Sequence, residues 1–249
     1  MCSTSSARLP LYIVAEYPRS GGTWFGQLLS ESLSIPFPRQ AVPRYESCVM
    51  HGHYLYSPRF KNTTCIVRDG RDVMISLYYQ LLFVNDRNDP KRIAILRQHL
   101  GYSDFADIRT NLPRFIVWLF ETESGRLSPY RFTWSRWVEN WHGHWQVLVR
   151  YEDLLSDTRS ELARALHALG ASVPEANVRQ AVEKYDFHAL TGRRPGQSDT
   201  SSFTRNGVAG TWRDTFSDEA KQVFATLAGD QLVLLGYEAD NCWAEHRGD

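Results

Sequence analysis

Residues 11–24 read Leu-Tyr-Ile-Val-Ala-Glu-Tyr-Pro-Arg-Ser-Gly-Gly-Thr-Trp, and this stretch decides the fold class. Its first five residues are apolar and partly β-branched, which is typical of a buried strand. Pro18 and the glycine pair that follows it predict a turn. From Thr23 to about Leu33 the apolar side chains recur at helical spacing. The predicted order is therefore strand, glycine loop, helix.

The same order recurs further along the chain. Residues 63–67 form an expected strand, which is followed by a turn at 68–70 and a helix at 71–83. A third clear strand is expected at 146–149, before a helix at about 156–169. Strands that alternate with helices imply a parallel sheet with helices on both faces, so we predict an α/β fold of three layers, α/β/α. Further expected elements are a strand at 47–51, helix-rich sequence at 91–145, helices at 174–190 and 217–235, and a long polar loop at 191–211.

Length and composition limit the class of protein. The 249 residues suffice for one large domain, and we expect a single domain over residues 1–249. The 28 basic and 28 acidic residues cancel, which disfavours a nucleic-acid partner. No apolar run approaches about 18 residues, so no membrane span is expected. Residues 1–10 lack the apolar core of a secretory signal and the four cysteines stand far apart, so we expect a cytoplasmic protein without a disulfide framework.

The glycine loop has the properties of an anion-binding site. Gly21 and Gly22 allow the backbone to curl until several N–H groups converge on one anion. The N-terminus of the next helix adds unpaired N–H groups and the positive end of the helix dipole. The loop therefore predicts the binding of a phosphate group at the carboxyl end of the sheet, where ligands bind in such folds. Its other polar donors are Arg19, Ser20 and Thr23.

The loop differs from the phosphate-binding loop of common ATP-dependent enzymes. That loop needs a lysine followed by a serine or threonine, and here Trp24 follows Thr23 with no lysine nearby. A magnesium-dependent nucleotide kinase with an atypical P-loop is kept as an alternative. Its acidic metal ligands would have to be Asp69, Asp72 or Asp153.

Two histidines alternate in residues 50–54, Met-His-Gly-His-Tyr. Side chains two residues apart on a strand point to the same face, so His51 and His53 lie together. Such a pair can ligate a metal, but the sequence shows no third ligand, and we expect no metal site. The location at a strand end favours a role in proton transfer.

Residues 17–24 resemble the 5′-phosphosulfate-binding loop, Tyr-Pro-Lys-Ser-Gly-Thr-Thr-Trp, of sulfotransferases that use 3′-phosphoadenylyl sulfate (PAPS). Residues 65–76, with an Arg at a strand end and a Ser eight residues later, are similar to the family's 3′-phosphate segment. Residues 203–213, Phe-Thr-Arg-Asn-Gly-Val-Ala-Gly-Thr-Trp-Arg, resemble its segment Arg-Lys-Gly-x-x-Gly-Asp-Trp-Lys. Residues 134–141 and 147–154 are similar to its Trp-rich helix and Tyr-Glu-Asp strand end.

The resemblance is to soluble members, of cytosolic or bacterial type. It implies a P-loop-like phosphosulfate-binding loop, PAPS as donor without a metal, and a small-molecule hydroxyl as acceptor. Arg19 takes the place of a lysine beside the oxygen that bridges phosphorus and sulfur, where a cation stabilises the charge of the breaking bond. His53 corresponds to the general base, with His51 as a fallback. The implied donor-binding residues are Arg19, Ser20, Gly21, Gly22, Thr23 and Trp24 at the phosphosulfate and adenine, Arg68, Ser76, Arg205, Asn206 and Gly207 at the 3′-phosphate, and Tyr151, with Phe187 a weaker candidate, near the adenine.

This sequence also departs from the family's pattern. The family has a Lys at the position of Arg19, often a Lys at that of Asn206, and an Asp at that of Thr211. A nucleotide-binding scaffold without turnover is therefore a further alternative. The dimerisation pattern of cytosolic members is absent, so no oligomeric state is predicted. Residues 84–130 show no family motif and are expected to shape the acceptor pocket. Trp134, Trp137, Trp141 and Trp145 are spaced along one helical face, which predicts core packing.

Overall fold

The computed structural model describes residues 10–38, 46–84, 89–121, 130–199, 202 and 206–245. The chain divides into two compact units, each made of two stretches of sequence. The first unit comprises residues 1–68 and 140–197, and the second comprises residues 69–139 and 198–249. The expectation of one domain over the whole chain stays a prediction.

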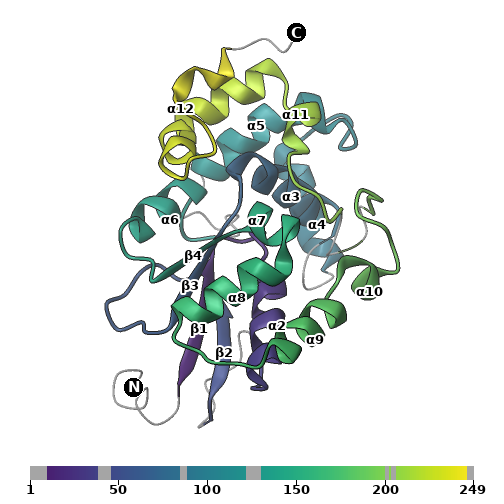
Figure 1. Cartoon of the computed structure of the whole chain (residues 1–249). Helices are drawn as coiled ribbons and strands as arrows, with labels where there is room; N and C mark the ends of the chain where they lie inside the picture. The colour runs from purple at the N-terminus through teal and green to yellow at the C-terminus, as the bar shows by residue number, and fades with distance from the viewer. Residues whose placement is uncertain are drawn as a thin grey trace. The chain divides into compact units, whose positions relative to one another are not determined.

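The first unit contains a four-stranded, wholly parallel sheet in the order β2-β1-β3-β4 (Figure 1). Each of the four expected strands is present, with boundaries that differ from the predicted ones by at most one residue. Every residue of β2 and β3 is buried, as is usual for strands of a parallel sheet. The strands are β1 (Leu11–Glu16), β2 (Cys48–Gly52), β3 (Thr63–Val67) and β4 (Val147–Arg150).

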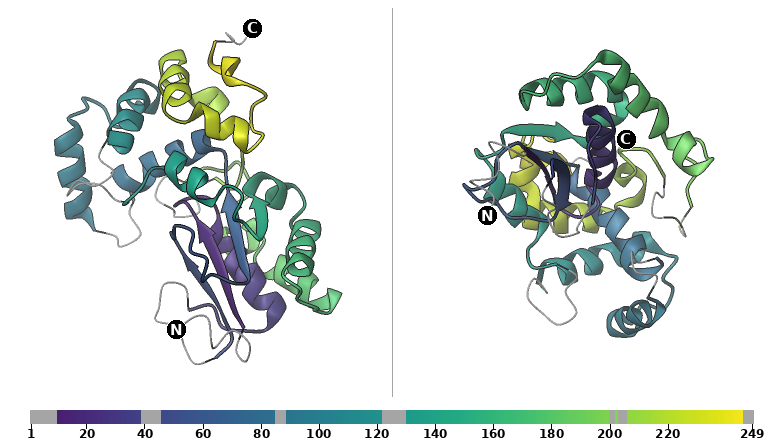
Figure 2. Two further views of the ribbon diagram at one scale, coloured as in Figure 1. Left: turned by 90° about the vertical axis from the view of Figure 1, so that its left-hand side faces the viewer. Right: turned by 90° about the horizontal axis from the view of Figure 1, so that it is seen from below.

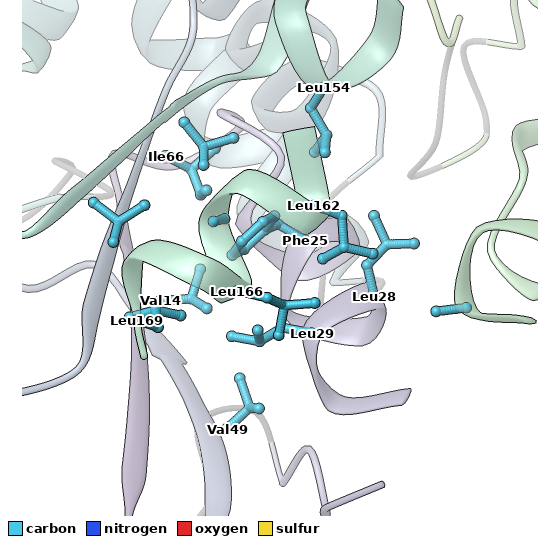
Figure 3. Packing of buried hydrophobic residues seen from close by; sticks show 14 of the residues in the cluster. Val14, Phe25, Leu28, Leu29, Val49, Ile66, Leu154, Leu162, Leu166 and Leu169 are labelled. Carbon is cyan, nitrogen blue, oxygen red and sulfur yellow. The ribbon is translucent and has the colours of Figure 1, made fainter. Parts of the chain in front are cut away.

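Helices α2 (Gly22–Leu33) and α8 (Thr158–Ala168) cover one face of this sheet, and α9 (Glu175–Lys184) packs beside them (Figure 2). Strand side chains such as Val14 meet Phe25 and Leu28 of α2 and Leu166 of α8 in one apolar cluster (Figure 3). This core fixes the sheet against α2, and thereby places the loop that joins β1 to α2. The unit also contains α7 (Tyr151–Ser156) and α10 (Phe187–Thr191).

The second unit is helical in its described part. Phe224 lies at the centre of its aromatic core, where its ring contacts those of Phe120, Trp134 and Phe216. A Cβ on Gly70 would lie 2.6 Å from Phe224 and 2.9 Å from Trp134, so the first turn of α3 approaches this core closely. The elements are α3 (Gly70–Leu82), α4 (Pro90–Leu100), α5 (Ile108–Glu121), α6 (Trp134–Trp141, whose last two residues belong to the first unit), α11 (Trp212–Thr215), α12 (Asp218–Leu234) and the 3-10 helix η1 (Asn241–Ala244).

The predicted α/β class is confirmed by the parallel sheet and its flanking helices, but one local expectation was wrong and the short helix α7 was not predicted. Trp145 lies beyond α6, because the chain turns after Trp141 through Gly143, whose φ is +74°. The sequence also gave no sign of α7, since six residues are too few to show a helical period. The described residues between 192 and 211 form neither helix nor strand, as the long loop requires. No helix in the described ranges is long and apolar enough to cross a membrane.

The core between α8 and the sheet makes a direct stability prediction. Leu166 is only 2% exposed, so Leu166→Ala leaves a cavity and lowers the free energy of unfolding by about 2–5 kcal/mol, measured by urea denaturation. Leu190→Ala is the matched control, because Leu190 is 44% exposed, and its loss stays below about 0.5 kcal/mol. Equal losses in the two variants would contradict this placement of the core.

Candidate functional site

The glycine loop joins β1 to α2 within the first unit and adopts the curled backbone that the sequence predicts. Gly21 is the N-terminal cap of α2 and has a φ of +99°. Arg19 also has a left-handed φ, +72°, which is uncommon for a residue that carries a Cβ. The N–H of Phe25 donates to the Gly21 carbonyl at 3.0 Å and closes the first helical turn. The N–H groups of that turn therefore lie at the loop.

Neither glycine leaves room for a side chain. A Cβ on Gly21 would lie 2.7 Å from the Cδ2 atom of the Tyr151 ring. A Cβ on Gly22 would lie 2.6 Å from the carboxyl carbon of Glu16 and 2.9 Å from His51 Nε2. Both glycines are thus required by the close approach of their neighbours, and Gly21 also by its backbone conformation.

The Ser20 hydroxyl lacks a hydrogen-bond partner within the described part of the protein. The residue is fully buried, and so is its Oγ atom. Buried polar atoms are nearly always paired in folded proteins, so such an atom needs an explanation. Its position in the glycine loop, beside the first N–H groups of α2, fits a ligand that carries acceptor oxygens.

Three predicted donor-binding residues from distant segments meet beside this loop. Arg68 follows β3, is 9% exposed, and donates from Nη1 to the Arg19 carbonyl at 3.3 Å. Its guanidinium lies 4.4 Å from the ring centre of Tyr151, which begins α7 directly after β4. The Tyr151 ring in turn meets Trp24 edge-on at 6.1 Å between centroids. The structure therefore brings Arg19, Trp24, Arg68 and Tyr151 together at the carboxyl end of the sheet.

Trp24 and Phe187, two candidates for the adenine, differ in their surroundings. The indole N–H of Trp24 donates to the Tyr185 carbonyl at 2.9 Å, which fixes its ring beside the loop. Phe187 begins α10, and the Arg193 guanidinium lies 5.5 Å from its ring centre. Trp24 is thus placed with the other loop residues, whereas Phe187 has a partner from its own C-terminal loop.

Glu16 was not singled out from the sequence, yet it links the loop to both histidines. Its Oε2 accepts the Gly22 N–H at 2.6 Å, and its Oε1 lies 2.7 Å from His51 Nε2. Its backbone oxygen accepts a hydrogen bond from His53 Nδ1 at 3.3 Å. The two imidazole rings meet edge-on with centroids 5.6 Å apart. The signal that could have revealed Glu16 is an acidic residue at the end of an otherwise apolar, buried strand.

The Glu16 carboxyl group is charged despite its burial. Burial acts to raise the pKa of Glu16, but the hydrogen bond and charge of His51, together with the charge of His53 and the Gly22 N–H, outweigh it. Its pKa therefore lies below the ordinary value, and a carboxylate stands at one end of the anion-binding loop.

The other predicted residues belong to the second unit. Ser76 is buried in α3, with 6% of its surface exposed. Asn206 is half-buried, and Gly207 has a left-handed φ of +63°. Arg205 lies outside the described residues. The proposed binding roles of these four residues stay predictions.

Asp72, which the sequence marked only as a candidate metal ligand of the kinase alternative, anchors the C-terminal motif to α3. Its carboxylate accepts hydrogen bonds from the N–H groups of Gly210 and Trp212 at 2.6 and 3.0 Å, and from the Thr211 hydroxyl at 2.9 Å. Thr211, at the position where the family has an Asp, thus helps to hold the motif on α3 through its hydroxyl. Because residues four apart share a helix face, the motif is held at the side of α3 that carries Ser76.

The acidic residues that a magnesium-dependent kinase would need are engaged in other contacts. Asp69 caps α3 through the Arg71 N–H at 2.9 Å and forms an ion pair with the Arg71 guanidinium at 2.7 Å. Asp72 accepts the three hydrogen bonds just described, and Asp153 is exposed on α7. These contacts give the kinase alternative no support.

Comparison with known proteins gives consistent matches. A family model described as the sulfotransferase domain matches residues 53–235, more than half of the chain. Sulfotransferase 1E1 of Cavia porcellus is 21% identical over 263 residues, which cover 85% of this chain and 79% of that protein. Sulfotransferase 1A1 of Bos taurus is 20% identical over 241 residues, which cover 85% of this chain and 80% of that protein.

Two solved structures share the fold. The mouse sulfotransferase SULT7A1, complexed with PAP, superposes with a TM-score of 0.63 at 15% identity and covers 92% of this chain and 89% of its own. Retinol dehydratase, in complex with androsterone and the inactive cofactor PAP, gives a TM-score of 0.57 at 20% identity. The match covers 89% of this chain and 80% of the retinol dehydratase chain. Both agree with the predicted α/β fold.

The contacts of Asp72 make a prediction about the second unit. Asp72→Ala leaves one buried and two partly buried donors without their acceptor and lowers the free energy of unfolding by about 2–4 kcal/mol in urea denaturation. Asp214→Ala, an exposed change in the neighbouring α11, is the control and costs less than about 0.5 kcal/mol. A neutral Asp72→Ala would show that the motif is held by other contacts.

Proposed function

Because the chain belongs to the sulfotransferase domain family, we propose that it transfers a sulfuryl group from PAPS to the hydroxyl of a small-molecule acceptor. The enzyme class predicted from the sequence, a sulfotransferase, is confirmed by the family match. The choice of donor rests on one observation, the curled loop whose buried Ser20 hydroxyl lacks a protein partner while Arg68 and Tyr151 stand beside it. Both structural neighbours were solved with PAP, which supports an adenosine donor here.

The loop would hold the phosphosulfate end of the donor. Its backbone N–H groups and the Ser20 and Thr23 hydroxyls supply donors, and Arg19 supplies a permanent positive charge. Trp24 and Tyr151 offer aromatic surface for the adenine, and Arg68 a forked cation for a phosphate. The assignment of Ser76 and residues 205–207 to the 3′-phosphate stays a prediction.

The transfer itself is proposed as an in-line displacement at sulfur. The acceptor oxygen forms a bond to sulfur while the bond from sulfur to the bridging oxygen breaks, and the electron pair of that bond stays on the departing phosphate. Arg19 stabilises the negative charge that grows on the bridging oxygen. A base removes the proton of the acceptor hydroxyl, and PAP and the sulfated acceptor are the products.

His53 is favoured over His51 as this base by burial and hydrogen bonding. A carbonyl oxygen can only accept, so the His53 Nδ1 that faces the Glu16 carbonyl carries the hydrogen, and Nε2 keeps its lone pair. His53 is half-buried, whereas His51 is only 2% exposed and is tied to the Glu16 carboxylate at 2.7 Å.

The donor site predicts tight binding of PAP that depends on Gly21. In isothermal titration calorimetry the wild-type protein binds one PAP. Gly21→Ala weakens binding by at least about 30-fold, because the added methyl group collides with the Tyr151 ring in a strained backbone. Gly170→Ala is the matched control, since Gly170 also has a positive φ, +70°, but open space around it. Unchanged affinity in Gly21→Ala would remove the loop from the donor site.

The assignment of the base predicts a loss of turnover without a loss of donor binding. The enzyme is incubated with PAPS, EDTA and a panel of phenols and alcohols, and PAP release is followed. His53→Ala lowers kcat by about 10²–10⁴-fold and changes the affinity for PAP little. His188→Ala, which removes an exposed histidine of α10, keeps the full rate.

The alternatives give different outcomes in the same assay. A full rate in His53→Ala with a loss in His51→Ala would move the base to His51. Tight binding of PAP without turnover on any acceptor would favour the non-catalytic scaffold. Turnover that EDTA abolishes would contradict a transfer without metal.

A further inference from the structure

Three side chains with metal-ligating atoms converge at the ends of β1 and β2. Glu16 ends β1, His51 lies on β2, and His53 follows one residue after β2 ends. The parallel register pairs Val14 with His51, so that Glu16 lies level with His53, two residues further along both strands. One nitrogen of each imidazole and one carboxylate oxygen all lie within 4.8 Å of one another. The structure thus supplies the third ligand that the His-x-His pattern lacks in the sequence.

The chemistry of this cluster fits a zinc-type cation. Two imidazole nitrogens and one carboxylate oxygen form a ligand set that binds zinc with a fourth position left for water or another ligand. The carboxylate is the one ligand of the three that brings a negative charge to a bound divalent cation. Glu16 and His51 are buried, whereas half-buried His53 offers a route from solvent.

Contacts around the cluster hold the ligands in place, as outer contacts do in metal sites. The Gly22 N–H fixes Glu16 Oε2 at 2.6 Å and leaves Oε1 facing His51. The Glu16 carbonyl holds the His53 ring at 3.3 Å. The Glu16 carboxylate can only accept a hydrogen bond, so His51 Nε2 carries a hydrogen, whereas the buried His51 Nδ1 has no hydrogen-bond partner among the described residues. A cation that binds at Nε2 takes the place of this hydrogen, as metals do when they displace protons from their ligands.

We propose that Glu16, His51 and His53 form a binding site for a divalent cation of the zinc type, and that occupancy of this site blocks the transfer reaction. A neutral imidazole has one lone pair, and coordination of His53 uses it, so the ring can no longer accept the acceptor's proton. The blocking effect rests on the proposed function, whereas cation binding does not. The cation is thus an inhibitor of a reaction that does not itself use a metal.

Binding is tested first, on the full chain without an affinity tag, after dialysis against EDTA. Titration with Co²⁺ is followed by visible absorption and with Zn²⁺ by calorimetry. We expect one equivalent to bind with an absorption band of four- or five-coordinate cobalt. Glu16→Gln and His53→Ala each weaken binding by at least about tenfold. His167→Ala, which removes an exposed histidine of α8, leaves binding unchanged.

Folding of each variant is checked by thermal melting. His53→Ala is the variant that should disturb folding least, because His53 is only half-buried. No stoichiometric binding to the wild-type protein would overturn the proposed site. Binding that survives both Glu16→Gln and His53→Ala would also overturn it, because the ion would then occupy a surface position.

The inhibitory effect is tested by adding Zn²⁺ to the PAPS assay. We expect loss of turnover at one equivalent of bound Zn²⁺, recovery on addition of EDTA, and unchanged affinity for PAP. Full turnover with the site occupied would overturn the inhibitory role. If the chain transfers no sulfuryl group at all, the cobalt titration still decides whether the cation site exists, so the two proposals fail separately.

Discussion

The close approach of Tyr151 and Glu16 to the glycine loop is the constraint on which the site depends. The strand register sets this approach, because Glu16 pairs with Ile66 and Val67 pairs with Arg150. Arg68 and Tyr151 therefore leave adjacent strands side by side, at the level where the loop leaves β1. A slip of one residue would turn these side chains to the other face of the sheet.

The carboxylate of Glu16 is hard to explain by fold stability alone. Burying an ion pair costs desolvation free energy that a well-packed apolar residue avoids. Here the carboxylate occupies one N–H of the helix N-terminus that could otherwise face an anion, and it holds His51 at 2.7 Å. A charge kept in this position, beside two histidines at a strand end, is the pattern expected of a functional site.

The fold and the curled backbone of the glycine loop were predictable because their signals are local. Apolar runs bounded by Pro and Gly define each strand, and the glycine pair admits few backbone paths. Glu16 and the contact of Asp72 with the C-terminal motif were not predicted, because the partners of these residues lie 35 and 140 residues away, and no local pattern reveals such distant contacts. The short α7 was not predicted for a different reason, since its six residues, which follow β4 directly, are too few to show a helical period.

Under the proposed function, donor binding and proton removal depend on different kinds of charge. Arg19 and Arg68 are permanent cations, so the attraction for a phosphorylated donor does not change with protonation. The proposed base belongs instead to the cluster of Glu16, His51 and His53, which places three metal-ligating atoms within 4.8 Å of one another. An arginine at position 19, in place of a lysine, keeps a fixed positive charge in the same loop as the Glu16 carboxylate. Changes in the histidine cluster can therefore alter the transfer step while the donor stays bound.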